Sequence, residues 1–153
     1  MELRSRINTA MKQAMKDKST ERLSTIRLIN AAIKDRDIAA RTEGKENGVG
    51  DDEVLAILSK MTKQRQESAK TYEEAGRLDL SERELAEIKV IEEFLPRQLT
   101  DSEIQFAVSE AIKEMGAGSI RDMGKVMGAL KSKYAGQMDF GAVGALVKNN
   151  LSS

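Results

Sequence analysis

The chain has 153 residues, of which 40% are hydrophobic and 33% charged, and its 25 basic side chains balance its 25 acidic ones. It has no His and no Cys, which excludes a His-assisted nucleophile, a thiolate nucleophile and zinc held by nitrogen or sulfur ligands. No apolar run approaches the roughly 20 residues that span a bilayer, and the sequence shows no Gly-rich phosphate loop, dinucleotide fingerprint or calcium loop. We therefore predict no catalytic residue, no cofactor and no metal site. We expect a cytoplasmic protein, because the N-terminus lacks the apolar core of a secretory signal.

One proline and 3% aromatic residues favour amphipathic helices over sheets, so we predict an all-α fold. Residues 2–17 and about 21–41 place apolar side chains at helical spacing. The segment 42–50 contains three glycines, and we expect it to be a mobile loop, too polar to hold a core position. Helices from Asp51 and from Ser81 then complete an N-terminal antiparallel four-helix bundle.

The third predicted helix has an apolar stripe with one charged member. The stripe consists of Val54, Leu58, Met61, Arg65, Ala69 and Tyr72. Arg65 either reaches past the stripe to solvent or pairs with an acid of a neighbouring helix. Gly76 is expected to end this helix. Ser81 and Glu84 are typical of a capping box at the start of the fourth helix, whose predicted buried face includes Leu85.

The only proline, Pro96, divides the chain. Proline lacks a backbone N–H and disfavours helical dihedrals in the residue before it, so the fourth helix should stop within the two preceding residues. Thr100 and Glu103 then form a predicted capping box in front of another apolar run. We therefore predict two domains, residues 1–95 and residues 96–153.

The residues after the proline predict a C-terminal domain of three shorter helices. The middle helix begins near Ser119, and Gly136 is expected to close it. Gly124 and Gly128 lie about one turn apart, which would let a neighbouring backbone approach this helix closely. The apolar stripe of the middle helix consists of Ile120, Met123, Met127, Leu130 and Tyr134. Asp139 is a predicted cap of the last helix.

Charge is distributed unevenly along the chain. Residues 1–41 carry 10 basic and 5 acidic side chains, residues 42–103 carry 9 and 16, and residues 104–153 carry 6 and 4. This pattern is typical either of a basic face that binds phosphates or of solvated helices with uneven charge. The candidate nucleic-acid contacts are Arg121, Lys125, Lys131, Lys133 and Lys148 near the C-terminus and Arg4, Arg6, Lys12 and Lys16 near the N-terminus. Lysines and arginines along a helix make salt-dependent contacts with a phosphate backbone.

Four sequence blocks occur in the order expected of one protein family. They are residues 63–68, 75–80, 94–99 and 122–130, and residues 136 and 143–151 follow them. Through these blocks the chain resembles the stand-alone YqeY-like proteins of the GatB/YqeY family over nearly its whole length. The motif residues of the joint and the tail are Pro96, Asp122, Met123, Gly124, Met127, Gly128 and Gly136.

The resemblance implies a role around transfer RNA. In this family the domain forms the tail of the B subunit of tRNA-dependent amidotransferases, and it is appended to some glutaminyl-tRNA synthetases. There it helps to hold tRNA while other domains carry the chemistry. This chain keeps a Gly-x-Val-Met segment at 124–127, but Gly128 replaces the usual lysine and residues 137–140 replace a Lys-Ala-Asn-Pro stretch. The resemblance therefore implies a non-catalytic tRNA-binding accessory module linked to tRNA-dependent amidation or aminoacylation.

Two alternatives stay open. In the first, the chain is a protein–protein adaptor that docks on an amidotransferase or a tRNA synthetase, and Met123 and Met127 provide an adaptable apolar surface unless both lie in the core. In the second, the family label implies a part in a carbon–nitrogen ligase activity with glutamine as amido-N-donor. Glu92 and Glu93 point to different helix faces, so they form no matched acid–base pair. The sequence does not indicate the oligomeric state.

Overall fold

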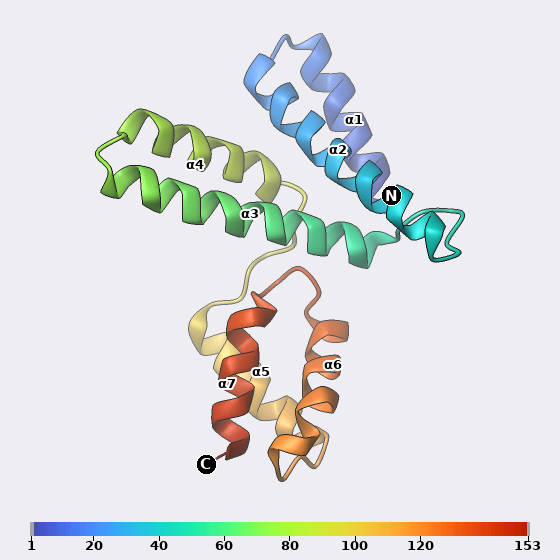
Figure 1. The fold of residues 1–153 in the computed structure, drawn as a ribbon, viewed down its shortest axis with the longest axis vertical. Helices are drawn as coiled ribbons and strands as arrows, with labels where there is room; N and C mark the ends of the chain where they lie inside the picture. Colours follow the sequence, from blue (N-terminus) through green and yellow to red (C-terminus); the bar gives the residue numbers. More distant parts are fainter. Residues whose placement is uncertain (1, 153) are drawn as a thin grey trace. The chain divides into compact units, whose positions relative to one another are not determined.

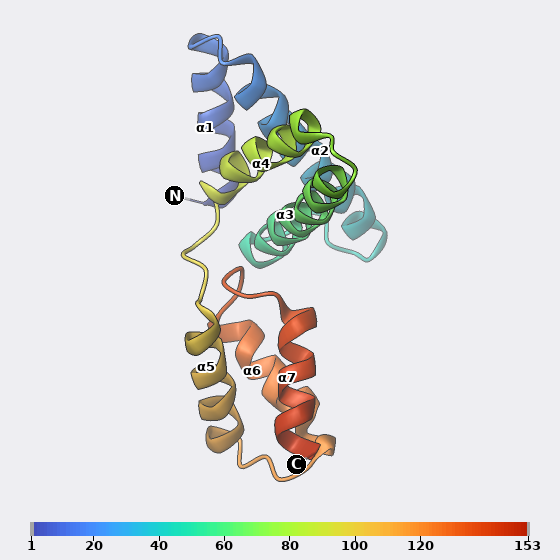
Figure 2. The same ribbon diagram turned by 90° about the vertical axis from the view of Figure 1, so that its left-hand side faces the viewer.

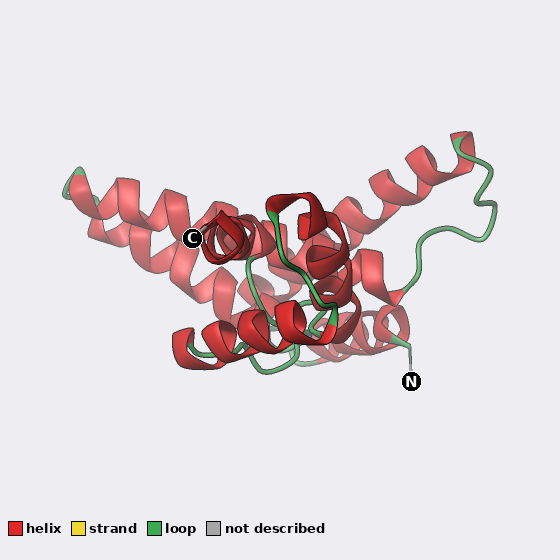
Figure 3. Cartoon of the chain, turned by 90° about the horizontal axis from the view of Figure 1, so that it is seen from below, coloured by secondary structure: helices red, strands yellow, loops and turns green. Residues whose placement is uncertain are grey.

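Helices account for all of the regular structure that the chain is seen to form. The computed structural model describes residues 2–152, and this range contains helices and loops but no strand (Figure 3). The prediction of an all-α fold is confirmed. In chain order the elements are α1 (Leu3–Lys16), α2 (Thr20–Thr42), α3 (Asp51–Glu74), α4 (Leu78–Glu92), α5 (Asp101–Glu114), the 3-10 turn η1 (Ile120–Asp122), α6 (Met123–Lys133) and α7 (Phe140–Ser152). Two compact units divide the chain, an N-terminal unit of Met1–Leu95 and a C-terminal unit of Pro96–Ser153.

The N-terminal unit consists of two antiparallel helical hairpins, α1 with α2 and α3 with α4. Figures 1 and 2 show that the two hairpins cross steeply. The unit is therefore not the expected bundle of four helices that run along one axis. Helix α2 packs against the other three helices of the unit. Its buried residues are Thr25, Ile26, Ile29, Ile33 and Ala40.

One hydrophobic core holds the two hairpins together. Ile7 of α1, Ile29 of α2, Leu58 of α3 and Ile91 of α4 each have 0% of their surface exposed. Burying an aliphatic side chain of this size contributes about 1.5–3 kcal/mol. Each of the four helices therefore stabilises the unit by burying its apolar face.

The loop between α2 and α3 is not the purely polar segment that we predicted. Val49 is 4% exposed and belongs to the core. Its N–H donates to Asp37 Oδ1 at 3.0 Å, and its carbonyl oxygen accepts from Arg4 Nε at 3.2 Å and from Arg4 Nη2 at 2.9 Å. Arg4 also forms a two-point ion pair with Asp37, in which Nη1 lies 2.9 Å from Oδ2. We call Arg4, Asp37, Gly48 and Val49 the loop clamp.

Charge and backbone shape both fix the loop clamp. The hydrogen bonds from the Arg4 guanidinium hold the pKa of Asp37 below its usual range; burial opposes this shift, and the Val49 N–H adds to it. The stabilisation from this carboxylate is therefore present at neutral pH and is lost as the pH falls below the ordinary pKa of aspartate. Gly48 has a φ of +80°, and a Cβ at this position would lie 2.5 Å from Asp37 Oδ1. Only glycine fits this site without moving the carboxylate.

Helix α4 begins earlier than predicted. Gly76, with a φ of +75°, follows the end of α3 as expected, but the N-cap of α4 is Arg77. Ser81 is therefore inside the helix, and its N–H donates to the Arg77 carbonyl at 3.1 Å. The predicted capping box of Ser81 and Glu84 does not exist, because Ser81 is not at a helix end. Leu85, which we predicted to be buried, is 48% exposed.

Arg65 in the middle of α3 pairs with an acid of the neighbouring helix. Its Nε lies 2.8 Å from Glu87 Oε2 of α4, and its Nη1 donates to the Met61 carbonyl at 3.3 Å. Of the two predicted alternatives for Arg65, the structure shows the pairing with an acid of a neighbouring helix. Since only 15% of the Arg65 side chain is exposed, removal of Glu87 would leave a charge largely withdrawn from water.

The segment after Pro96 is attached to the C-terminal unit by hydrogen bonds. The Leu99 N–H donates to the Gln137 carbonyl at 2.9 Å, and Gln98 Nε2 donates to the Gly136 carbonyl at 2.6 Å. Gly136 has a φ of +74°, so it turns the chain after α6. These bonds join the start of the unit to the loop between α6 and α7.

Thr100 and Glu103 form the predicted capping box at the start of α5. The Glu103 N–H donates to Thr100 Oγ1 at 3.2 Å, and the Thr100 N–H donates to Glu103 Oε1 at 3.0 Å. Arg97 adds two hydrogen bonds to the same carboxylate, at 2.9 and 2.8 Å. These contacts lower the pKa of Glu103 to about 2, and the hydrogen bonds from Arg97 are the largest cause.

The Glu103 carboxylate should remain ionised in moderate acid. Because its folded pKa is lowered from 4.5 to about 2, its contribution is complete above pH 4.5 and is lost as the pH falls through about 2. A carbon-13 NMR titration of the Glu103 carboxyl is the measurement. Arg97→Ala should move the midpoint up, whereas the control Ser102→Ala should leave it unchanged. A midpoint that stays the same in Arg97→Ala would contradict the assignment of the cause.

The C-terminal unit has its own core, built by α5, α6 and α7. Its most enclosed residues are Val108, Val126, Leu130, Val143 and Val147. Ile120 was predicted to belong to the stripe of the middle helix, but it is 46% exposed, whereas the unpredicted Val126 is fully buried. The reason is that residues 120–122 form a 3-10 turn, and its three residues per turn shift the phase of the stripe before α6 begins. No described residue belongs to the cores of both units.

Candidate nucleic-acid interface

Charge is segregated within the C-terminal unit. The acidic residues of α5 are Asp101, Glu103, Glu110 and Glu114, against one basic residue, Lys113. Helices α6 and α7 contain no acidic residue at all, and their basic residues are Lys125, Lys131, Lys133 and Lys148. The surface built by α6 and α7 is therefore positive, and this sign attracts phosphates.

Packing of α6 determines which of its residues face solvent. Val126 and Leu130 are buried, so helical spacing turns Gly124, Lys125 and Gly128 outward. A Cβ at either glycine would meet no atom within 4 Å. The predicted close approach of a neighbouring backbone at these glycines is therefore wrong. They instead leave an open strip of backbone beside the lysines.

The lysines of α6 are available to a ligand. Lys125, Lys131 and Lys133 are all exposed, and none forms an ion pair with another described residue. Lys133 Nζ lies 5.6 Å from the ring centroid of Tyr134, a cation–π contact at the end of the helix. Phosphate groups can therefore reach these ammonium groups without breaking an ion pair.

Arg121 and Lys148 extend the same surface beyond α6. Arg121 is exposed on η1. Lys148 is exposed on α7 one turn after Gly144, and a Cβ on Gly144 would lie 3.7 Å from Met123 Cε and 3.8 Å from Met127 Cε of α6. Lys148 therefore lies on the side of α7 toward α6, and α7 also packs against η1. We call the exposed residues Arg121, Gly124, Lys125, Gly128, Lys131 and Lys148 the α6 basic face. Lys133 is at the C-terminal end of α6, on the opposite side of the helix from Gly124.

Met123 and Met127 belong mainly to the packing of the unit. Both are half-buried and packed against the C-terminal core. The glycine that allows a close approach in this unit is Gly144, on which both methionine tips lie, and not Gly124 or Gly128. This arrangement favours the core interpretation of the two methionines over an adaptor surface.

The four N-terminal candidates do not form one basic surface. Every side-chain nitrogen of Arg4 is engaged in the loop clamp, so a phosphate would have to break that clamp to reach it. Arg6 Nη2 donates to the Glu93 carbonyl at 3.2 Å. Lys12 and Lys16 are exposed and make no ion pair with another described residue. Of the four candidates in this unit, Lys12 and Lys16 are the two that keep the predicted character of free cations.

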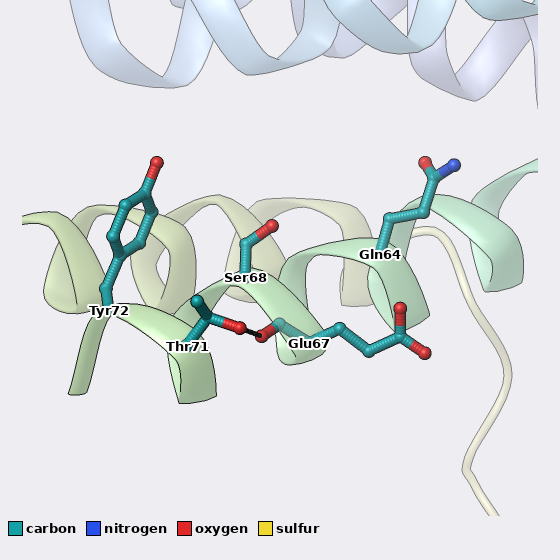
Figure 4. A pocket seen from close by; sticks show the side chains of 5 residues that line it. All are labelled: Gln64, Glu67, Ser68, Thr71 and Tyr72. Carbon is teal, nitrogen blue, oxygen red and sulfur yellow. Dashed lines mark hydrogen bonds between the residues drawn. The ribbon is translucent and has the colours of Figure 1, made fainter. Parts of the chain in front are cut away.

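A shallow hollow of about 490 Å³ lies over α3. Figure 4 shows the five side chains that line it, Gln64, Glu67, Ser68, Thr71 and Tyr72. Thr71 Oγ1 donates to the Glu67 carbonyl at 3.0 Å. Sequence reasoning placed Tyr72 in the core stripe and missed the hollow. The signal that could have revealed it is the block at 63–68, which provides three of the lining residues.

The described residues contain neither a cluster of metal ligands nor a membrane-spanning helix. Among residues 2–152, no three acidic side chains lie close enough together to hold a metal ion. In the same part of the chain, no helix is long and apolar enough to cross a membrane.

The fold and the charge pattern define a two-unit helical protein with a basic outer surface on its C-terminal unit. The family model described as Yqey-like protein matches residues 4–151. The chain belongs to this family, and the resemblance drawn from the sequence blocks is confirmed.

Two relatives give the scale of the similarity. One is the "Altered inheritance of mitochondria protein 41, mitochondrial" of Pyrenophora tritici-repentis, 29% identical over 134 residues, which cover 86% of this chain and 71% of the relative. A protein of the same name from Clavispora lusitaniae is 28% identical over 156 residues, covering 99% of this chain and 86% of the relative. The similarity therefore includes both units.

Proposed function

We propose that this protein is a non-catalytic tRNA-binding accessory module linked to tRNA-dependent amidation or aminoacylation. The observation that carries the proposal is the α6 basic face, on which exposed cations surround an open strip of backbone and no acidic residue of α6 or α7 intervenes. In this proposal the chain holds the RNA and other proteins carry out the chemistry.

Recognition would rely on the phosphate backbone and on RNA shape. Lysine and arginine side chains contact phosphates irrespective of sequence, and each neutralised phosphate adds to the salt dependence of binding. Without a side chain at Gly124 and Gly128, a phosphate strand can come closer to the axis of α6 than at other positions. Base stacking needs exposed aromatic rings. Tyr134 beside Lys133 and Phe140 at the start of α7 are both half-buried, and the exposed ring of the unit, Phe106, lies on the acidic helix α5.

In this proposal the two units have different roles. A C-terminal domain with three α-helices would bind the RNA, while an N-terminal domain with four would support it or contact a partner enzyme. The proposal requires a compartment that contains tRNA. For this chain we expect the cytoplasm, and both relatives carry the word mitochondrial in their names.

A salt titration of binding to total tRNA tests the proposal. The wild-type chain should bind at low salt and lose affinity steeply as salt rises. The variant Lys125→Glu/Lys131→Glu/Lys133→Glu should reduce the magnitude of the slope of log K against log salt by about 3, since each lost phosphate contact removes about one unit.

A matched control separates a local contact from a change in net charge. Lys60, Lys70 and Lys89 are exposed lysines of the N-terminal unit, and their triple change to glutamate alters the net charge by the same amount. This control should keep most of the salt slope. Equal losses in the two variants would show that only net charge matters, and no binding by the wild type at low salt would refute the proposal.

A further inference from the structure

The outer face of α2 carries a heptad pattern that the core does not use. Its seam positions, spaced four and three residues apart, are Ser24, Leu28, Ala31, Asp35, Ile38 and Thr42. All six residues are exposed, and they lie on the side of the helix opposite the buried Ile26, Ile29 and Ile33. In a coiled coil, residues at such positions are apolar and pack against another helix. Here Leu28, Ala31 and Ile38 are apolar, and the other three are polar.

Two large apolar side chains in this seam are exposed. Leu28 is 45% exposed and Ile38 is 51% exposed. Ala31, between them in the seam, is small enough to let a second helix come close. The seam spans about five turns of α2, and no other described helix covers it.

A row of basic residues borders the seam on one side. Arg27, Lys34 and Arg41 each directly precede a seam residue and repeat every seven positions. All three are exposed, and none forms an ion pair with another described residue. In a coiled coil, residues at this position face the flanking residues of the partner helix and select its charge. The partner that fits therefore carries acidic side chains beside its apolar seam.

Asp35 adds a second condition on the partner. It is an exposed charge inside the seam, between Ala31 and Ile38. A polar residue at one seam position fixes the register of a helix pair, because it is satisfied only by a suitable residue opposite. A lysine or arginine of the partner at that point would neutralise it, whereas an apolar residue would bury the carboxylate unpaired.

We propose that α2 is a docking surface for one amphipathic helix of another protein, with an apolar seam, acidic flanks and a basic residue opposite Asp35. Charge disfavours a second copy of α2 as the occupant. An antiparallel pair would place the row Arg27, Lys34 and Arg41 against itself, and a parallel pair in register would place Asp35 against Asp35. This proposal does not depend on the proposed function, since α2 and the α6 basic face lie in different units.

Two designed peptides test the proposal on the full chain. Each has about three heptads, an apolar seam and one central lysine; one has glutamate at the flanking positions and the other has lysine there. Fluorescence anisotropy should show binding of the acidic peptide and not of the basic one. Hydrogen exchange should show new protection in α2 when the acidic peptide is added. Equal binding of both peptides, or protection elsewhere, would overturn the proposal.

Variants of exposed residues identify the surface without affecting the core. Ile38→Glu should weaken binding of the acidic peptide about tenfold or more, because a carboxylate would enter the apolar contact beside acidic flanks. The control Leu85→Glu makes a similar change on α4, where Leu85 is 48% exposed, and should leave binding unchanged. Arg27→Glu/Lys34→Glu/Arg41→Glu should reverse the preference toward the basic peptide.

Two other results would assign the surface to a different occupant. Self-association of the wild type that Ile38→Glu abolishes would identify a second copy of the chain. Competition between tRNA and the acidic peptide, removed by the triple change in the basic row, would identify RNA. Either result would overturn the proposal of a protein helix.

Discussion

The variant Gly48→Ala should lower the free energy of unfolding of the N-terminal unit by about 3 kcal/mol, since it adds backbone strain to the loss of half-buried hydrogen bonds. The backbone strain arises because Gly48 has a φ of +80°. The hydrogen bonds are lost because the new Cβ would lie 2.5 Å from Asp37 Oδ1 and force that carboxylate away from Arg4 and from the Val49 N–H. Chemical denaturation monitored by circular dichroism measures the change.

Gly44 in the same loop provides the matched control. Its φ is +90°, so alanine is strained there as well, but a Cβ would meet no atom within 4 Å. Gly44→Ala should therefore cost only about 1 kcal/mol, the backbone part of the effect. Equal costs for the two variants would show that the loop clamp contributes nothing beyond backbone strain.

The variant Leu130→Ala should destabilise the C-terminal unit by about 3 kcal/mol, the cost of removing a leucine side chain from a packed core and leaving a cavity. Leu130 is 1% exposed, and a unit of this size has little stability to lose. Because the two cores share no described residue, the N-terminal unit should keep its stability. Hydrogen exchange should show faster exchange after Pro96 and unchanged exchange before it.

Leu78→Ala is the corresponding control, since Leu78 is 61% exposed. The same chemical change at a surface position should cost no more than about 0.5 kcal/mol. If Leu130→Ala accelerates exchange equally in both units, the units unfold together and the inference of two independent cores is wrong.

Local sequence motifs predicted the structure correctly where both interacting residues lie within one helical turn. The capping box of Thr100 and Glu103 was predicted correctly, because both groups lie within one turn and no other helix is needed to form it. The same pattern failed at Ser81. There the turn at Gly76 leads directly into α4, so the Ser81 N–H already has a partner in the Arg77 carbonyl. The capping-box pattern therefore forms only when its first residue is at the start of a helix.

Contacts between distant segments could not be read from the sequence. Val49 is a single apolar residue in a polar stretch, and what brings it into the core is a pair of residues from two other helices, Arg4 and Asp37. The same contacts remove Arg4 from the candidate phosphate ligands. By contrast, Lys125 and Lys131 were predictable as outward residues, because the stripe of their own helix sets their direction.

The packing of two methionines on Gly144 means that oxidation of either one would alter a contact between two helices of the C-terminal unit. With no cysteine in the sequence, thioethers are its oxidisable sulfur groups, and the half-buried Met123 and Met127 place their methyl tips on Gly144. Conversion to sulfoxide would put a polar, chiral oxygen into this contact between α6 and α7. Methionine oxidation would therefore displace the helix that carries Lys125, Lys131 and Lys133, and methionine sulfoxide reductase would restore its position.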